Sequence, residues 1–392
     1  MDSKLFDFTL DRTNTSSVKW DLRKDLYNKE DVLPMWVADM DFATPNFIID
    51  AIKQRLSHPV LGYSFRSESY FQSIINWQKK QHNWEIKKEW ICFSPGVVPA
   101  LNMLVLALTN ENDKIIIQPP VYPPFFDAVK NNNRKLLLNQ LNYEDGKYSI
   151  NFKDLKEKIA LGAKMLILSN PHNPCGRVWK KEELISIIEL CKENDVLILS
   201  DEIHCDLVLS NFKHQALAFV GKEYSDHIIT AIAPSKTFNI AGMASSSVII
   251  SNEELRKKYE NTLETIHVGM GNVLGAVASE AAYTLGELWL EHLINYLSSN
   301  ISYTNERLAP YQKLVKVIPT EATYLLWLDF NGMRLTDAEL SDFLIQKANL
   351  GLNKGTDFGS GGSGFARMNI ACSKETLVHA LNQLEVALKE FN

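Results

Sequence analysis

The 392-residue sequence lacks features that mark several large classes of protein. Its five cysteines are widely spaced, with no Cys-x-x-Cys pair, so a disulfide framework is excluded and reduced thiols of a cytoplasmic protein are expected. Its longest apolar runs, such as residues 101–108, fall short of the ~20 residues that span a bilayer. Residues 1–7 carry acids where a signal peptide has a basic start, so we expect neither membrane insertion nor export.

The sequence also lacks a basic stripe and the common metal and triphosphate motifs. Lysine and arginine total 41 against 47 aspartates and glutamates, which gives a net charge of −6, and the basic residues are scattered. Nucleic-acid binders concentrate their positive charge, so a nucleic-acid partner is not expected. No His-Glu-x-x-His, clustered Cys/His set or P-loop occurs, so no metal is expected.

The middle of the chain alternates short apolar runs with helical periods. Residues 164–169 and 196–200 are typical of buried strands, and between them Leu184, Ile187 and Cys191 fall on one face of a helix. Further strands are expected at 115–117, 228–233 and 247–250, and a buried helix at 97–108. This pattern predicts an α/β fold, a large domain whose mainly parallel sheet is covered by helices on both faces.

The last hundred residues have a different character. The pair Thr336 and Glu339 forms a capping box that begins a helix, and residues 376–388 supply a final amphipathic helix. We predict a smaller α+β domain, with a boundary near Gly286. The large domain is then 46–286, and residues 1–45 join 287–392 in the small one.

One motif is rejected because its surroundings are wrong. Residues 359–364 satisfy G-x-G-x-x-G, but that dinucleotide fingerprint requires a strand before it and a helix after it. Here we expect a loop at 353–358 before it and a strand at 366–371 after it. A flexible active-site loop or a linker is the interpretation we adopt.

Polar side chains follow three of the predicted strands, at the sheet edge where α/β proteins bind ligands. Singly, Asp201 could be a helix N-cap and Lys236 a surface lysine, but together with the amides at 170–173 they suit a pyridine-based aldehyde cofactor. A neutral lysine amine forms a Schiff base, and a carboxylate keeps the ring nitrogen protonated. The free N–H groups at the start of helix 97–108 could hold a phosphate; they belong to Gly96, Val97 and Val98.

The motifs NPHNPCGR (170–177), SDEIH (200–204) and PSKTFNIAG (234–242) resemble the fold-type I pyridoxal-phosphate enzymes, the aminotransferase superfamily. The segments 33–42, 94–100, 119–125 and 364–369 look like its cystathionine beta-lyase branch, the MalY/PatB-type carbon–sulfur lyases. The resemblance covers nearly the whole chain. It implies pyridoxal 5′-phosphate as cofactor and a homodimer as the assembly.

The resemblance also implies roles for single residues. Lys236 would hold the cofactor covalently, Asp201 would contact its ring nitrogen, and Asn173 its phenolic oxygen. Tyr122 would stack on the ring, and Arg367 and Asp39 would bind the substrate. The phosphate must rely on other groups than in many aminotransferases, and Ser235 and the helix start after Gly96 are the candidates. Tyr63 would reach the phosphate of the neighbouring subunit, its alternative being a core tyrosine. His204 would be either a neighbour of the phenolic oxygen or a packed imidazole. Ala244 stands where many aminotransferases carry an arginine, which weakens a generic aminotransferase assignment.

The expected activity is therefore cleavage of cystathionine or related S-substituted L-cysteines to a thiol, pyruvate and ammonia. Two alternatives stay open at this point. The first is an aminotransferase, in which the same substrate carbanion is reprotonated instead of losing its sulfur. The second, suggested by the maltose-modulator relatives, is a protein that acts chiefly by binding a transcriptional regulator.

Overall fold

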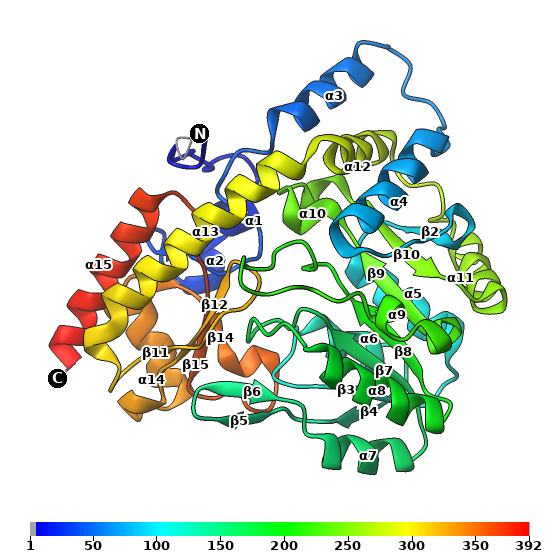
Figure 1. Ribbon diagram of the computed structural model, residues 1–392. Helices are drawn as coiled ribbons and strands as arrows, with labels where there is room; N and C mark the ends of the chain where they lie inside the picture. The colour runs from blue at the N-terminus through cyan, green and yellow to red at the C-terminus, as the bar shows by residue number, and fades with distance from the viewer. Residues whose placement is uncertain (1–4, 392) are drawn as a thin grey trace.

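A computed structural model describes residues 5–391 and shows a large sheet beside a smaller one (Figure 1). Residues 1–4, part of the start from which a cytoplasmic location was predicted, lie outside the described residues. In the large sheet β10 runs antiparallel to its two neighbours, β2 and β9, and the other neighbouring strands are parallel to one another. The strands in spatial order are β2 (Ile91–Ser94), β10 (Ser246–Ile250), β9 (Ile228–Ile232), β8 (Leu197–Asp201), β7 (Ala163–Ser169), β3 (Lys114–Ile117) and β4 (Lys135–Leu138).

Alternate residues of these strands face two different layers of core. In β7, Met165 and Ile167 pack in one apolar cluster, while Leu166 and Leu168 pack in the other. This is the period of two that a strand buried on both faces requires. The predicted α/β class is confirmed, because helices cover both faces of a mainly parallel sheet.

Helix α5 (Val97–Leu108) has the predicted bounds, and α8 (Lys181–Glu193) buries the predicted stripe. α5 lies with α6 and α11 on the Met165 side of the sheet. The other helices of this part of the chain are α3 (Asn46–Leu56), α4 (Glu68–His82), α6 (Pro124–Lys130), α7 (Phe152–Ala160), α9 (Leu217–Val220), α10 (Pro234–Thr237), α11 (Glu253–Thr265) and α12 (Val273–Leu285).

The smaller sheet is antiparallel and lies next to the long helix α13 (Glu287–Leu308) (Figure 1). Its strands in spatial order are β11 (Lys316–Val317), β12 (Leu325–Asp329), β15 (Phe365–Asn369) and β14 (Asn353–Lys354). The capping box of Thr336 and Glu339 is present at the start of α14. The remaining helices are α1 (Val18–Asp21), α2 (Arg23–Tyr27), α14 (Asp337–Asp342) and α15 (Lys374–Phe391).

Two small strand pairs complete the fold. β1 (Leu33–Pro34) runs parallel to β13 (Leu350–Gly351) and ties the N-terminal segment to the small sheet. β5 (Asn142–Glu144) and β6 (Lys147–Ser149) form a hairpin. We keep the division into 46–286 and 1–45 with 287–392 as a proposal, which this pairing and the turn at Gly286 between α12 and α13 support.

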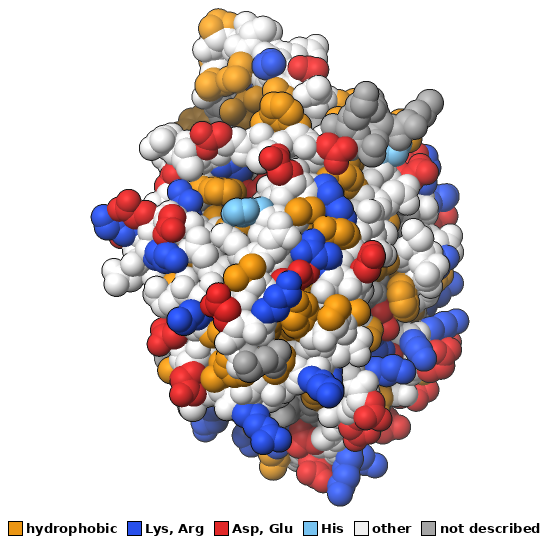
Figure 2. Space-filling view, turned by 90° about the vertical axis from the view of Figure 1, so that its left-hand side faces the viewer, with side chains coloured by type: hydrophobic (Ala, Val, Ile, Leu, Met, Phe, Trp, Pro, Cys, Tyr) orange, Lys and Arg blue, Asp and Glu red, His pale blue; other side chains and the backbone are white. Residues whose placement is uncertain are grey.

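One prediction about local structure is wrong. Residues 353–358 are not a plain loop, because they form β14 and a short 3-10 helix, Gly355–Phe358. β14 pairs with β15 at Arg367, and this pairing arises only in the tertiary structure. Within residues 5–391, no helix has both the length and the apolar character needed to cross a membrane. Acidic and basic side chains are interspersed on the face that Figure 2 shows.

Candidate active site

The polar groups predicted at three strand ends meet at one edge of the large sheet. β7, β8 and β9 are adjacent and parallel, and Ser169, Asp201 and Ala231 stand side by side in their register. The chain turns after each strand, and α10 with Lys236 follows β9. Parallel strands present their carboxyl ends together, so residues far apart in the sequence converge here.

A cavity of about 790 Å³, including its open mouth, lies at this edge. Nine of the predicted site residues line it: Gly96, Val97, Val98, Tyr122, Asn173, Asp201, His204, Ser235 and Lys236. The other three, Tyr63, Arg367 and Asp39, do not line the cavity.

Lys236 presents its amine inside the cavity. Its Nζ donates a hydrogen bond of 2.6 Å to the carbonyl oxygen of Ala38. Burial, together with the positive charge of Arg367, lowers the pKa of Lys236 to about 8, against the weaker opposing influence of Asp39 and Asp201. At this pKa roughly a tenth of the amine is neutral at pH 7, far more than for an ordinary lysine, and only the neutral form acts as a nucleophile or base.

Asp201 is a buried carboxylate with little local compensation. Burial raises its pKa to about 7, although one oxygen accepts the backbone N–H of Ile203 at 3.1 Å. A buried acid in this state favours either a proton or a cationic neighbour. The site therefore suits a ligand that places a protonated ring nitrogen beside Asp201.

Arg367 lies in the middle of β15 and is 3% exposed. It donates to three uncharged oxygens: Asn173 Oδ1 at 2.9 Å, Asn353 Oδ1 at 2.7 Å and the carbonyl of Trp36 at 3.3 Å. Burial lowers the pKa of Arg367 to about 10. A guanidinium held in this way favours an anion, and a carboxylate can accept two of its N–H groups.

The remaining lining groups combine an aromatic ring, an imidazole and a helix start. Burial raises the pKa of the Tyr122 phenol, so this side chain is neutral. Burial, followed by the charges of Lys236 and Arg367, lowers the pKa of His204 to about 3, so its imidazole is neutral as well. Gly96 caps α5, whose first-turn N–H groups have no partner within the helix and can bind an anion.

Asp39 sits next to the cavity-lining Ala38, but its carboxylate already has a cationic partner. Arg12 reaches it at 2.7 Å and also binds Asp41 at 2.7 Å, and Asp41 in turn pairs with the buried Lys19. Asp39 is thus part of an ion-pair network that fixes the N-terminal segment. A direct contact with substrate stays a proposal.

Tyr63 does not join the cavity of its own chain. It lies between α3 and α4, and it is 97% exposed, next to Phe65 at 90%. This exposure excludes the alternative that Tyr63 is a core residue. Two neighbouring, almost fully exposed aromatic rings are typical of a surface that binds another protein.

Sequence reasoning missed the groups near the small sheet that hold the backbone of residues 37–39 beside Lys236. Tyr324 donates to the Ala38 carbonyl at 3.0 Å, the same oxygen that accepts from Lys236. Asn369 donates to the carbonyls of Val37 and Asp39 and so holds this segment beside the cavity. A backbone carbonyl carries no residue-type signal, so no sequence pattern could have identified the Ala38 oxygen.

Comparison with known proteins defines the class of this chain. Residues 30–384 match the family described as aminotransferase class I and II, and the chain belongs to that family. It is 42% identical over 384 residues to cystathionine beta-lyase PatB of Bacillus subtilis, covering 98% of this chain and 99% of that protein. It is 31% identical to protein MalY of Escherichia coli, with 95% and 96% covered.

Solved structures of related proteins share the whole fold. Cystalysin from Treponema denticola, which contains pyridoxal 5′-phosphate, superimposes with a TM-score of 0.95 at 36% identity, covering 99% of each chain. The PLP-bound C-S lyase from Staphylococcus hominis has a TM-score of 0.91 at 36% identity, covering 98% of this chain and 97% of that one. The family and fold predicted from the motifs are thus confirmed.

Proposed function

We propose that this chain is a pyridoxal-phosphate-dependent carbon–sulfur β-lyase that cleaves cystathionine or related S-substituted L-cysteines to a thiol, pyruvate and ammonia. The observation that carries this proposal is the buried Lys236 amine in a cavity that Asp201 also lines, near enough to the buried Arg367 for the charge of Arg367 to lower the pKa of Lys236. Relatives named as cystathionine beta-lyases, which match this chain over nearly its full length, support the lyase activity.

The groups around the cavity fit this cofactor chemically. Asp201, whose raised pKa calls for a cationic neighbour, would contact the pyridine nitrogen. The N–H groups of residues 96–98 and the Ser235 hydroxyl would hold the phosphate. They would take the place of the arginine that many aminotransferases carry where Ala244 stands here. Asn173 would contact the phenolic oxygen and Tyr122 would stack on the ring. Pyridoxal phosphate supplies an aldehyde and an electron-withdrawing ring that stabilises negative charge at the substrate Cα.

The residues of the chain then bind the substrate and move its protons. Arg367 would bind the substrate α-carboxylate as a bidentate pair and orient the Cα–H bond. The neutral amine of Lys236 would take the Cα proton as a general base. The β-thiolate would leave with the electron pair of the broken carbon–sulfur bond, and Lys236 or a water would protonate it. A water would then hydrolyse the remaining three-carbon part of the substrate to pyruvate and ammonia.

The assay that tests this function omits any keto-acid acceptor. Purified protein with cystathionine should release pyruvate, ammonia and thiol in equal amounts, and Lys236→Ala should abolish all three. Lys80→Ala, which alters an exposed lysine of α4 paired with Glu287, is the matched control. Turnover that requires a keto acid and yields no pyruvate would instead identify an aminotransferase.

We further propose a homodimer in which Tyr63 of one copy reaches the cavity of the other, as the exposure of Tyr63 and Phe65 supports. A cytoplasmic location is proposed because all five cysteines are free thiols, which fits a reducing compartment. Binding of a regulator protein stays a prediction. A pull-down with the inactive Lys236→Ala variant tests it.

A further inference from the structure

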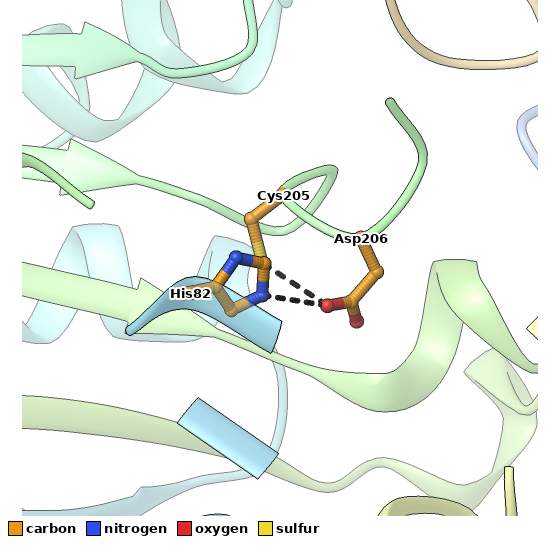
Figure 3. Close-up of side chains that lie close together, drawn as sticks. All are labelled: His82, Cys205 and Asp206. Atoms are coloured by element: carbon orange, nitrogen blue, oxygen red, sulfur yellow. Dashed lines mark hydrogen bonds and ion pairs between the residues drawn. The ribbon is translucent and has the colours of Figure 1, made fainter. Parts of the chain in front are cut away.

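A buried polar cluster lies below the turn that carries Lys236. Figure 3 shows His82, the last residue of α4, directed at Asp206, with Cys205 beside them. His82 Nε2 lies 2.8 Å from Asp206 Oδ1, and Cys205 Sγ lies 3.8 Å from the same oxygen. None of these residues lines the cavity, and the proposed chemistry does not use them.

Asp206 accepts hydrogen bonds from two elements, α4 and α10. Trp77 Nε1 donates to Oδ1 at 3.0 Å, and Thr237 Oγ1 donates to Oδ2 at 2.9 Å. Burial alone would raise the pKa of Asp206, but the hydrogen bonds from His82, Trp77 and Thr237 lower it below its usual value. Histidine, cysteine and aspartate are also metal-binding types, but here N–H and O–H donors already occupy both carboxylate oxygens.

Thr237 follows Lys236 directly within the single turn of α10. Lys236 extends to the carbonyl of Ala38, whereas Thr237 extends to Asp206. The next residue, Phe238, packs on Trp77 of α4 with ring centroids 5.7 Å apart, so two successive residues tie this turn to Asp206 and to α4. A side chain is held accurately only when its own backbone is fixed by surrounding contacts.

We propose that Asp206 is a positioning residue that acts through the Thr237 hydroxyl to fix the backbone of α10 and, with it, the direction in which Lys236 enters the cavity. The hydrogen bonds of Asp206 to Trp77 and His82 connect this turn to α4. The proposal rests on the proposed function for the role of Lys236. The contact between Asp206 and Thr237 can be tested apart from that role.

The test removes only the hydrogen bond between Thr237 and Asp206. Asp206→Asn would disturb three donors at once, so Thr237→Val, which keeps the side-chain shape and removes only the hydroxyl, is the main variant. Thr237→Ser restores the hydroxyl and is the rescue. Thr304→Val is the matched control, because Thr304 is fully buried in α13 and its hydroxyl donates to the carbonyl of Asn300 in the same helix.

Three readouts are compared on the cofactor-loaded proteins: amide hydrogen exchange of residues 234–240, the pH titration of the visible absorbance, and kcat and KM with cystathionine. Thr237→Val should speed exchange in this segment, shift the titration midpoint by about half a unit or more and lower kcat about tenfold with KM nearly unchanged. Thr237→Ser should restore all three, and Thr304→Val should change none.

Unchanged exchange and titration in Thr237→Val would overturn the proposal, as would equal changes in Thr304→Val. Failure of the proposed function looks different. It would show in the wild-type protein, as absent visible absorbance or absent pyruvate, while the amide exchange of Thr237→Val would still report whether Asp206 holds the turn.

Discussion

Arg367 donates a hydrogen bond of 2.9 Å from its guanidinium to the side-chain oxygen of Asn173. The two residues are 194 positions apart in sequence, one in β15 of the small sheet and the other in the turn after β7. This contact connects the proposed carboxylate-binding group to the proposed cofactor-binding amide. Because Asn173 uses its oxygen for Arg367, its NH₂ group is left to donate toward the cavity.

Replacing Arg367 by lysine should weaken substrate binding far more than it alters the cofactor. Lysine keeps the charge but cannot form a planar bidentate pair, so kcat/KM for cystathionine should fall about 10²-fold, mainly through KM. Steady-state kinetics measure this. Arg307→Lys, in an ion pair with Glu385 away from the cavity, is the control. An unchanged KM in Arg367→Lys would remove Arg367 from substrate binding.

Loading of the cofactor should depend on pH through the Lys236 amine, whose pKa is lowered to about 8. Only the neutral amine attacks an aldehyde, so the loading rate of cofactor-free protein should rise with pH up to about 8 and then level off. Stopped-flow absorbance measures it. With Nα-acetyl-lysine, whose side-chain amine has an ordinary pKa, the rate of reaction with the cofactor should keep rising above pH 8. Parallel curves for the two amines would contradict a lowered pKa.

Asp201→Asn should stabilise the cofactor-free protein while damaging catalysis. Because burial raises the Asp201 pKa to about 7, well above its unfolded value of 3.8, wild-type stability falls as pH rises between these two values. Asparagine does not titrate, so the variant should melt higher than wild type at pH 8, with the difference vanishing near pH 4. Calorimetry checks this dependence.

The same variant should lose kcat about 10²-fold, because the ring nitrogen would no longer be held in its protonated form. Addition of cofactor should raise the melting temperature of wild type more than that of Asp201→Asn. Equal gains for both proteins would mean that Asp201 does not contact the cofactor.

Tyr63→Ala and Lys236→Ala should complement each other if Tyr63 acts across a dimer interface. Each homodimer would be impaired, but a mixed dimer carries both defects in one site and leaves the second site intact. After subunit exchange, activity should recover to about a quarter of wild type, the value for random pairing of two subunits. Mixing Lys236→Ala with Arg367→Lys is the control. On the proposed arrangement each of these changes damages the site of the subunit that carries it, so a mixed dimer has no intact site and its activity should not recover. If activity does not recover with Tyr63→Ala, Tyr63 does not act in the site of the neighbouring subunit.

The sequence predicted those parts of the site that local chemistry marks. Lys236, Asp201 and Asn173 follow strands whose apolar runs were evident, and parallel strands must bring their ends together. Helix α5 could be placed to the residue because its apolar density and the preceding Pro95-Gly96 define its start. By contrast, β14 was missed, because a strand of two residues paired to β15 is too short to show a periodic pattern in the sequence.

The order of apolar and polar residues therefore determined the sheet, its helices and the identity of the reacting groups, because these depend on neighbours within a few positions in sequence. Only the tertiary structure decided what each group faces. It brought the Ala38 carbonyl within hydrogen-bond distance of the Lys236 amine and paired Arg12 with Asp39. It also joined Asp206 to Thr237 by a hydrogen bond and left Tyr63 exposed to solvent. Burial and charge at a site depend on segments distant in sequence, and so the pKa values of Lys236 and Asp201 follow from folding rather than from their motifs.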